Sequence, residues 1–227
     1  MSERVSAVVV NYNEPTLERC LQSLSQQTVP LKEIIIADGG SSKEQLEIAQ
    51  QHGKVIGPIQ GIGKARVQAI LEAENEYILS CDSDSIYDPS YVEYALENLH
   101  EANAVRAGTI LPLEWNEWLG LVETTFSLLP PYEFSYAFRR SAFLAAKLHH
   151  EDYSHPRADI GWHLAWRLLP RLDPRMKVWT RFPTQGAKTA TAYVPAALGA
   201  LATLAGVTAI PAANEISKLL KGRRITL

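Results

Sequence analysis

The sequence predicts an α/β fold with a doubly wound, mostly parallel β-sheet. Short apolar runs rich in β-branched residues recur between residues 5 and 80, as expected for strands buried on both faces of a sheet. Segments with apolar residues at helical spacing separate these runs. Strands that alternate with single helices pair in parallel through right-handed crossovers, so the two observations together predict the sheet.

Four strands and three helices are expected in the first half of the chain. The strands are the apolar runs at residues 5–10, 34–37, 54–56 and 77–80. The helices are the periodic segments at residues 16–27, 43–53 and 63–73. Ligands bind such sheets at the carboxyl ends of the strands, which selects residues 11–14, 38–42 and 82–84 as candidate contacts.

The second half of the chain has a different pattern. Strands are expected at residues 104–111 and 176–180, and helices at residues 114–128, 138–148 and 160–169. No low-complexity linker separates the two halves. We therefore expect residues 1–112 and 113–188 to be halves of one domain.

Composition excludes several classes of protein. The chain has 227 residues, of which 46% are hydrophobic, and a formal net charge of −3. The aliphatic content excludes general disorder, and the negative charge disfavours a nucleic-acid partner. The chain has only two cysteines, Cys20 and Cys81, which cannot form a disulfide framework or provide the four ligands of a structural zinc site. This low cysteine content indicates a reducing compartment. With no signal peptide visible before the first expected strand, we expect a cytoplasmic protein.

Two carboxylates follow the fourth expected strand. Asp82 and Asp84, separated by Ser83, repel each other unless a positive group lies near them. Mg²⁺ and Mn²⁺ prefer oxygen ligands and bind one or two carboxylates together with phosphate oxygens. The pattern therefore indicates a divalent cation with a diphosphate; the alternative is that both residues only cap a turn.

Two further segments offer contacts to a nucleotide. Asp38 can accept hydrogen bonds from a base edge or a ribose, and Gly39 allows close approach of the backbone; the alternative is a local turn around Asp38. Gly61 opens a helix that carries Lys64 and Arg66, an arrangement that suits an anion. Both the dinucleotide-binding fingerprint and the P-loop are absent.

Taken together, these segments resemble the family 2 glycosyltransferases, which have the GT-A fold of nucleotide-diphospho-sugar transferases. The resemblance rests on VVVNYNE at residues 8–14, IIADGGS at 35–41, the Gly61 to Arg66 segment and DSD at 82–84, in this order and spacing. It covers residues 4–112 well and extends to about residue 188.

The resemblance implies inverting transfer of a sugar from a nucleoside diphosphate sugar to a lipid-phosphate or glycan acceptor, with Mg or Mn as cofactor. Asp38 would read the base, Asp82 would lie toward the ribose, and Asp84, with Asp82 beside it, would hold the metal. The residues expected at the nucleotide are Asn11, Tyr12, Glu14, Asp38, Gly39, Gly61, Lys64, Arg66, Asp82 and Ser83.

On the acceptor side the sequence departs from the family pattern. The family usually has a Glu-Asp pair before a helix, with one carboxylate as the base. Here Ala158 occupies the Glu position if Asp159 is aligned, so Asp159 is the expected base and an N-cap role is its alternative. Glu151 and Asp152 form an alternative pair. The segment at residues 181–189 resembles the basic segment that polyprenyl-phosphate sugar transferases of the same family place before their membrane helices, which implies that Arg181 and Lys188 meet phosphate groups of the acceptor. Arg140 is a further expected phosphate contact on this side.

Residues 189–214 form an uncharged run, followed by Lys218, Lys221, Arg223 and Arg224. The run exceeds the roughly 20 apolar residues that span a bilayer, but Pro195 and Pro211 interrupt it. We expect residues 189–227 to be an apolar helical tail at the cytoplasmic face of a membrane. Spanning, re-entrant and soluble packing remain open for this tail.

Two other functions compete with sugar transfer. A nucleotidyltransferase can use a similar sheet, although its glycine-rich basic segment is missing near the N-terminus. A catalytically degenerate module that binds sugar nucleotides at a membrane would explain Ala158. A phosphate acceptor would explain it too, because an ionised phosphate needs no general base.

Overall fold

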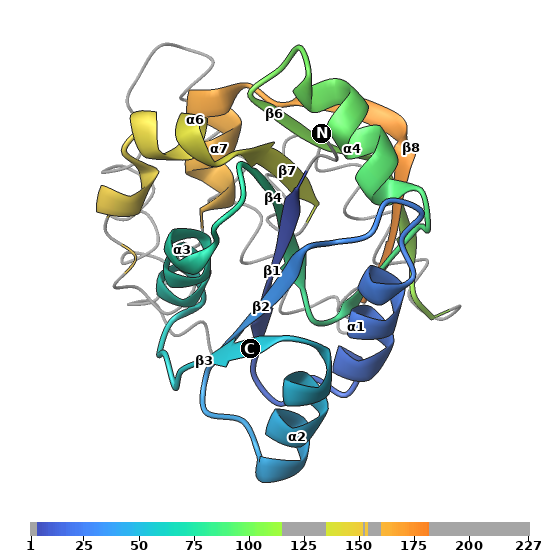
Figure 1. Cartoon of the computed structure of the whole chain (residues 1–227), viewed down its shortest axis with the longest axis vertical. Coiled ribbons are helices and arrows are strands. Elements are labelled where there is room, and N and C mark those ends of the chain that lie inside the picture. The colour runs from blue at the N-terminus through green and yellow to red at the C-terminus, as the bar shows by residue number, and fades with distance from the viewer. Residues whose placement is uncertain (1–3, 115–134, 152, 154–159, 182–227) are drawn as a thin grey trace, which may run out of the picture. The chain divides into compact units, whose positions relative to one another are not determined.

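A computed structural model describes residues 4–114, 135–151, 153 and 160–181 of the chain. Apart from Glu114, these residues belong to one compact unit. In Figure 1 helices lie on both sides of a central sheet, which agrees with the expected α/β class. The expected helix at 114–128 and the apolar tail at 189–227 lie outside the described residues.

The sheet has eight strands in the described part of the chain, in the order β3-β2-β1-β4-β7-β6-β8-β5. Strands β1 to β4 pair in parallel, as predicted. Beyond β4 the sheet is mixed, because β7 is antiparallel to both β4 and β6, β6 is parallel to β8, and β5 is antiparallel to β8. The strands are β1 (Val5–Asn11), β2 (Glu33–Asp38), β3 (Lys54–Ile56), β4 (Tyr77–Asp82), β5 (Ser85–Tyr87), β6 (Ala104–Pro112), β7 (Tyr136–Arg139) and β8 (Arg171–Thr180).

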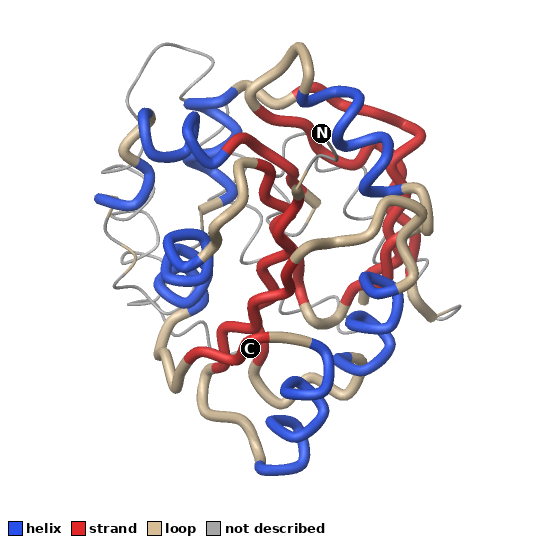
Figure 2. The backbone as a smooth tube through the Cα atoms, in the orientation of Figure 1, coloured by secondary structure: helices blue, strands red, loops and turns tan. Residues whose placement is uncertain are grey.

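Helices cover the sheet in two layers, visible in the tube view of Figure 2. One hydrophobic core contains side chains of α1, α2 and α4, and the other contains side chains of α3, α6 and α7. Every residue of β1 is buried, as expected for a strand between two layers. The helices are α1 (Leu17–Ser25), α2 (Lys43–His52), α3 (Ile62–Glu72), α4 (Tyr91–Leu99), α6 (Arg140–Ala145) and α7 (Gly161–Leu168), with a 3₁₀ turn at Leu148–His150.

The expected helix at residues 138–148 is wrong at its start. Tyr136–Arg139 forms strand β7, with Phe138 opposite Ile78 of β4, and helix α6 begins only at Arg140. The backbone hydrogen bonds of two flanking strands outweigh the local helical pattern there. Strand β5 and helix α4 were not predicted, and β8 begins five residues before the expected start.

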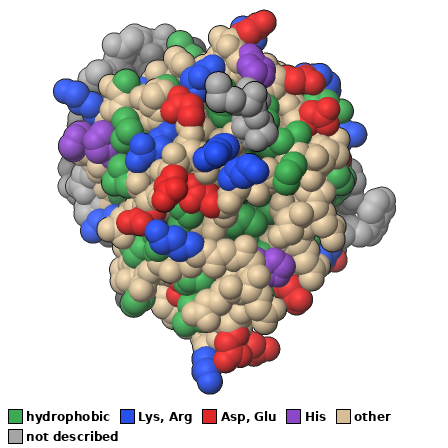
Figure 3. All heavy atoms as spheres, in the orientation of Figure 1, with side chains coloured by type: hydrophobic (Ala, Val, Ile, Leu, Met, Phe, Trp, Pro, Cys, Tyr) green, Lys and Arg blue, Asp and Glu red, His purple; other side chains and the backbone are tan. Residues whose placement is uncertain are grey.

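Within the described residues, no helix combines the length and the apolar character needed to cross a membrane. On the face of the molecule seen in Figure 3, acidic and basic side chains alternate instead of forming one continuous basic surface. This distribution accords with the small net charge of −3.

Candidate active site

The carboxyl ends of three neighbouring strands bring the predicted polar residues together. Asn11 ends β1 opposite Asp38, which ends β2, and Val10 lies opposite Asp82, which ends β4. Because these strands are parallel, the three polar side chains share one edge of the sheet. Figure 1 shows β2, β1 and β4 side by side in that order.

Asp38 is the buried centre of a hydrogen-bond network. Its Oδ2 accepts the backbone N–H groups of Gly40 and Ser41, both at 2.8 Å, and its Oδ1 accepts Asn11 Nδ2 at 3.2 Å. The Asp38 side chain is 2% exposed. The turn expected as the alternative role of Asp38 is therefore present, and it leaves one of the four lone-pair positions of the carboxylate without a donor among the described residues.

Tyr12 presents an exposed ring beside Asp38. The side chain is 69% exposed, and a Cβ added to Gly39 would lie 3.2 Å from Tyr12 Cδ2. The next residue, Asn13, has a left-handed backbone with φ of 50°, and its N–H donates to Ser41 Oγ while its Oδ1 accepts the N–H of Ser42. This brace between two loops fixes the backbone that carries the exposed aromatic ring.

Arg66 lies beneath Asp82 and does not reach the surface. Its guanidinium pairs with Asp82 Oδ1 and donates to Ser80 Oγ at 2.9 Å and to the Cys81 carbonyl at 3.1 Å. The Arg66 side chain is completely buried. Its charge therefore neutralises one oxygen of Asp82 and orients that carboxylate, whereas the sequence placed Arg66 only among the residues near the donor.

Asp84 is a largely buried carboxyl whose pKa is raised. Burial and, after it, the charges of Asp82 and Glu14 raise the pKa of its carboxyl from 3.8 to about 7, while the hydrogen bond from Ser85 and, less strongly, the charge of Arg181 oppose this rise. Two hydroxyl groups contact its Oδ1, Ser85 Oγ at 3.1 Å and Thr180 Oγ1 at 3.5 Å. A group with this environment lowers its free energy when a cation binds.

Arg181, which follows β8, reaches the same edge. Its Nη1 lies 3.1 Å from Glu14 Oε1 and its Nη2 donates to Thr16 Oγ1 at 3.4 Å. Glu14 in turn accepts the N–H of Thr16 and donates its own N–H to Asn11 Oδ1. The predicted residues Glu14 and Arg181 thus pair with each other at this edge, and the charge of each affects the pKa of Asp84.

The other predicted residues have different positions. Gly61, with φ of 95°, precedes α3, and Lys64 is exposed on the first turn of that helix. Ser83 is buried and donates its N–H to the Val10 carbonyl at 3.3 Å. Arg140 is not at this edge: it donates to the carbonyls of Ile70 and Leu71, near the end of α3 farthest from Gly61.

Glu151, one of the alternative acceptor carboxylates, is paired with Arg167 of α7. His163 lies on the same helix, with its Nδ1 4.0 Å from Glu151 Oε2, and burial lowers the pKa of that imidazole. Because the lowered pKa favours a neutral His163, the ion pair of Glu151 is with Arg167. Asp152, Asp159 and Lys188 lie outside the described residues.

Two carboxylates of the DSD segment suit a divalent cation bound to a diphosphate. Among the described residues, no three His, Cys, Asp or Glu side chains form a group that could hold a metal ion. Mg²⁺ and Mn²⁺ do not need such a group, since they complete their coordination with phosphate oxygens and water. The buried carboxyl of Asp84, with its raised pKa, fits this kind of site.

Ser41, from the expected segment 38–42, also contributes to the site, as do Ser85, Tyr87 and Thr180, which the sequence did not indicate. Tyr87 OH accepts the N–H of Asp82 at 3.2 Å, and Ser41 Oγ accepts Asn11 Nδ2 at 3.1 Å. Ser41 thus supports the expectation that segment 38–42 lies at this edge. Thr180 comes from a distant strand, and no local pattern marks it.

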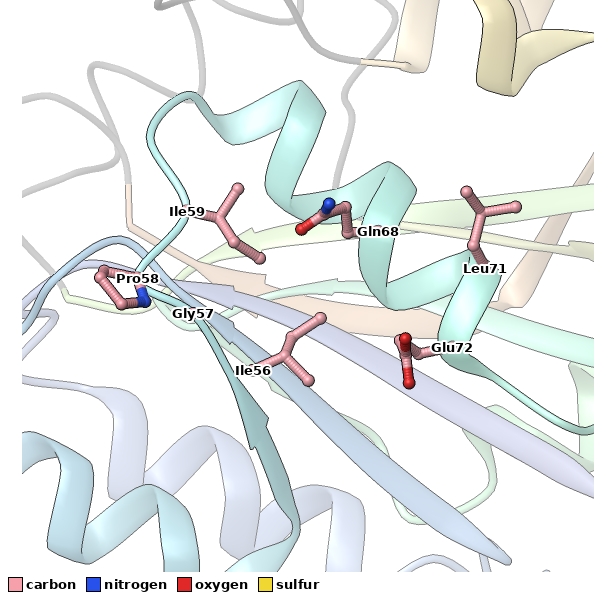
Figure 4. A pocket seen from close by; sticks show the side chains of 7 residues that line it. All are labelled: Ile56, Gly57, Pro58, Ile59, Gln68, Leu71 and Glu72. Atoms are coloured by element: carbon pink, nitrogen blue, oxygen red, sulfur yellow. The ribbon is translucent and has the colours of Figure 1, made fainter.

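A pocket of about 400 Å³ lies elsewhere, between β3 and α3 (Figure 4). Figure 4 shows Ile56, Ile59 and Leu71 among its lining side chains. Glu72, its charged lining residue, pairs with Lys54 at 2.7 Å. The lining offers no positive group to a phosphate, and the carboxylates of the DSD segment are not part of it.

Several known proteins resemble the chain. EpsH of Bacillus subtilis (strain 168), named as a candidate glycosyltransferase, is 37% identical over 100 residues, which are 40% of this chain and 29% of EpsH. Glycosyltransferase GlyG of Streptococcus pneumoniae serotype 4 is 33% identical over 113 residues, which are 46% of this chain and 38% of GlyG. The chain thus spans well under half the length of either relative.

The fold also has a solved counterpart. The crystal structure of S. aureus TarS 1-349 in complex with UDP-GlcNAc aligns with a TM-score of 0.61 at 17% identity, over 79% of this chain and 59% of that one. This likeness supports the GT-A type of fold. Residues 6–151 match the family described as Glycosyl transferase family 2, which is more than half of the chain. The chain therefore belongs to glycosyl transferase family 2.

Proposed function

We propose that the chain is an inverting, metal-dependent glycosyltransferase whose donor is a uridine diphosphate sugar. The observation that carries the proposal is the convergence of Asn11, Asp38, Asp82 and Asp84 at one edge of the sheet. The buried network around Asp38 suits a base, and the carboxylates of the DSD segment suit a metal-bound diphosphate. TarS, a structural neighbour, has been solved with UDP and with UDP-GlcNAc.

The hydrogen bonds of Asp38 favour uracil over guanine. The carboxylate accepts three donors from the protein, so one lone-pair position remains, on Oδ1. Uracil presents one N–H donor on its Watson–Crick edge, whereas guanine presents two adjacent donors that need two acceptor positions. A guanine would leave one buried donor unpaired, at a cost of about 1–3 kcal/mol. The exposed ring of Tyr12 offers a surface for stacking.

The ribose and diphosphate are assigned to the carboxylates beside the base site. Asp82, neutralised on one oxygen by Arg66, can accept a ribose hydroxyl. Asp84 would hold Mg²⁺ or Mn²⁺ with diphosphate oxygens. The bound metal would offset the negative charge that develops on the departing nucleoside diphosphate. Arg181, which pairs with Glu14, and Lys64, on the first turn of α3, would attract the diphosphate by their positive charge.

The acceptor is a lipid phosphate or a glycan hydroxyl at the cytoplasmic face of a membrane. An attacking oxygen displaces the nucleoside diphosphate at the anomeric carbon, so the configuration inverts. A hydroxyl acceptor gives its proton to a base, for which we propose Asp159, whereas an ionised phosphate needs none. Lys188, the basic residues after position 217 and the uncharged run at 189–214 favour a membrane-bound acceptor.

The test is product analysis with UDP-sugars, Mn²⁺ and membrane extracts or glycans as acceptors. We expect release of free UDP, loss of release in Asp84→Ala, and full activity in the control Glu72→Gln, which removes a carboxylate away from this edge. A parallel assay with UTP and a sugar 1-phosphate in place of the UDP-sugar tests the alternative, since release of pyrophosphate there would indicate a nucleotidyltransferase. Metal-dependent UDP binding without turnover of any donor would indicate the degenerate binding module.

A further inference from the structure

Two buried hydroxyl groups interrupt an otherwise apolar contact between β5 and β8. Ser85 lies directly opposite Thr180, and Tyr87 lies opposite Val178, in antiparallel register. Alternate residues of a strand point to the same face, so both pairs face the same side of the sheet. Tyr87 and Val178 belong to a hydrophobic core there, whereas Ser85 and Thr180 are polar and are only 0% and 2% exposed.

The hydroxyl groups bond to each other and to Asp84. Ser85 Oγ and Thr180 Oγ1 are 2.8 Å apart, and both approach Asp84 Oδ1, at 3.1 and 3.5 Å. Each hydroxyl has one hydrogen to donate. One hydroxyl therefore donates to the other hydroxyl, and the hydroxyl that accepts this bond donates its own hydrogen to the carboxylate. Burial of a hydroxyl without a partner is costly, and Asp84 is what completes this set within the described residues.

The arrangement distinguishes the two oxygens of Asp84. Oδ1 receives the hydroxyl contacts, and no hydrogen bond to Oδ2 occurs in the described part of the chain. A carboxylate rotated by such a contact has a defined orientation, so one oxygen stays available to a ligand. Residues that orient a metal-binding side chain in this way commonly affect metal affinity about 10-fold or more.

We propose that Thr180 is a positioning residue that acts with Ser85 on Asp84. The hydroxyl pair holds Oδ1 and thereby presents Oδ2 to the divalent cation of a bound nucleoside diphosphate. Thr180 also precedes Arg181, which pairs with Glu14, so the end of β8 contacts two acidic residues of the site. The inference rests on the proposed function, because it presupposes a cation at Asp84.

Three variants of the full chain test the role of the hydroxyls. Thr180→Val removes the hydroxyl while keeping the branched shape, Ser85→Ala removes its partner, and Thr180→Ser restores a hydroxyl at that position. Calorimetry measures the affinity for UDP with and without Mn²⁺. We expect the Mn²⁺-dependent gain in UDP affinity to fall about 10-fold in Thr180→Val and in Ser85→Ala. It should return toward the wild-type value in Thr180→Ser, and UDP affinity without metal should stay within about twofold, since Thr180 does not contact the base site.

The outcomes separate this inference from the proposed function. If Mn²⁺ increases the UDP affinity of Thr180→Val and Ser85→Ala as much as that of the wild type, the positioning role is wrong and the proposed function is unaffected. The positioning role is also wrong if the variants lose as much UDP affinity without Mn²⁺ as with it, because general damage to the β5–β8 pair would have that effect. If the wild-type chain binds UDP without any response to Mn²⁺, both the metal role and the positioning role are wrong. Should Thr180→Val not fold, Ser85→Ala decides the question on the same measurements.

Discussion

Replacing Asp84 with asparagine should stabilise the metal-free protein. Burial and neighbouring acidic charges raise the pKa of the Asp84 carboxyl from 3.8 to about 7, so ionised Asp84 opposes folding. A shift of about three pKa units corresponds to roughly 4 kcal/mol. Because relaxation around the charge reduces such a penalty, we expect about 2–4 kcal/mol. Asparagine keeps the oxygen that accepts from Ser85 and Thr180 and removes the charge.

The pH dependence gives this effect a sign that can be checked. Below pH 4 Asp84 is protonated in both the folded and the unfolded chain, so the carboxyl carries no penalty. Between pH 4 and 7 the unfolded chain ionises first and stability falls, and above pH 7 the penalty is complete. The gain in Asp84→Asn should therefore be largest at pH 8 and much smaller at pH 5.

Thermal unfolding with a metal chelator present measures the gain. For a chain of this size, 2–4 kcal/mol corresponds to a rise in Tm of roughly 6–12 °C at pH 8. Asp82→Asn is the matched control, and it should lower Tm, since it leaves the buried Arg66 without its ion pair. An unchanged or lower Tm in Asp84→Asn, or an equal gain at pH 5 and pH 8, would refute the electrostatic argument.

Metal affinity, a second buried carboxylate and a glycine beside Asp38 should each respond in a defined way. Mn²⁺ affinity should rise about tenfold per pH unit up to pH 7, because Asp84 must lose its proton to bind the ion; calorimetry showing equal affinity at pH 6 and 8 would contradict this. Asp173→Asn should lower the free energy of unfolding, measured in urea, by about 1–3 kcal/mol at pH 7 and by less at pH 3. The hydrogen bond from Arg175 lowers the pKa of the buried Asp173 carboxyl, so the stability that this carboxylate contributes is lost as the pH falls. An equal loss of stability at both pH values would refute this reasoning. Gly57→Ala should lower both Tm and UDP affinity. The φ angle of Gly57 is 138°, and a Cβ there would lie 2.4 Å from the backbone carbonyl oxygen of Asp38, so the substitution must displace Asp38. Wild-type UDP affinity in this variant would argue against a role of Asp38 in binding the base.

Sequence reasoning succeeded where a site residue directly follows a buried strand. Asn11, Asp38 and Asp82 each come after an apolar run, and parallel pairing of those strands brings them to one edge. The same reasoning predicted that Arg66 lies near the donor, yet it could not show that the side chain is buried beneath Asp82. Residue spacing along a helix predicts which face of the helix carries a side chain. How deeply that side chain is buried depends on which other parts of the chain pack over it.

Contacts between distant segments could not be predicted. Thr180 and Asp84 are 96 residues apart, and they meet only because β5 pairs with β8 at the edge of the sheet. Phe138 and Arg139 of β7 were predicted as the start of a helix, because the strands that pair with β7, β4 and β6, come from other parts of the chain. Arg140 has the charge of a phosphate ligand, and its carbonyl partners on α3 become visible only in the fold.

We expect UDP and a divalent metal to bind together at the edge formed by β1, β2 and β4. Anomalous diffraction from crystals of the chain grown with UDP and Mn²⁺ locates both ligands. We predict a manganese peak bonded to a carboxylate oxygen of Asp84 and to diphosphate oxygens, at about 2.0–2.3 Å, with uracil N3 facing Asp38 Oδ1. Nucleotide bound at this edge without manganese at Asp84, or bound in the pocket between β3 and α3, would contradict the account.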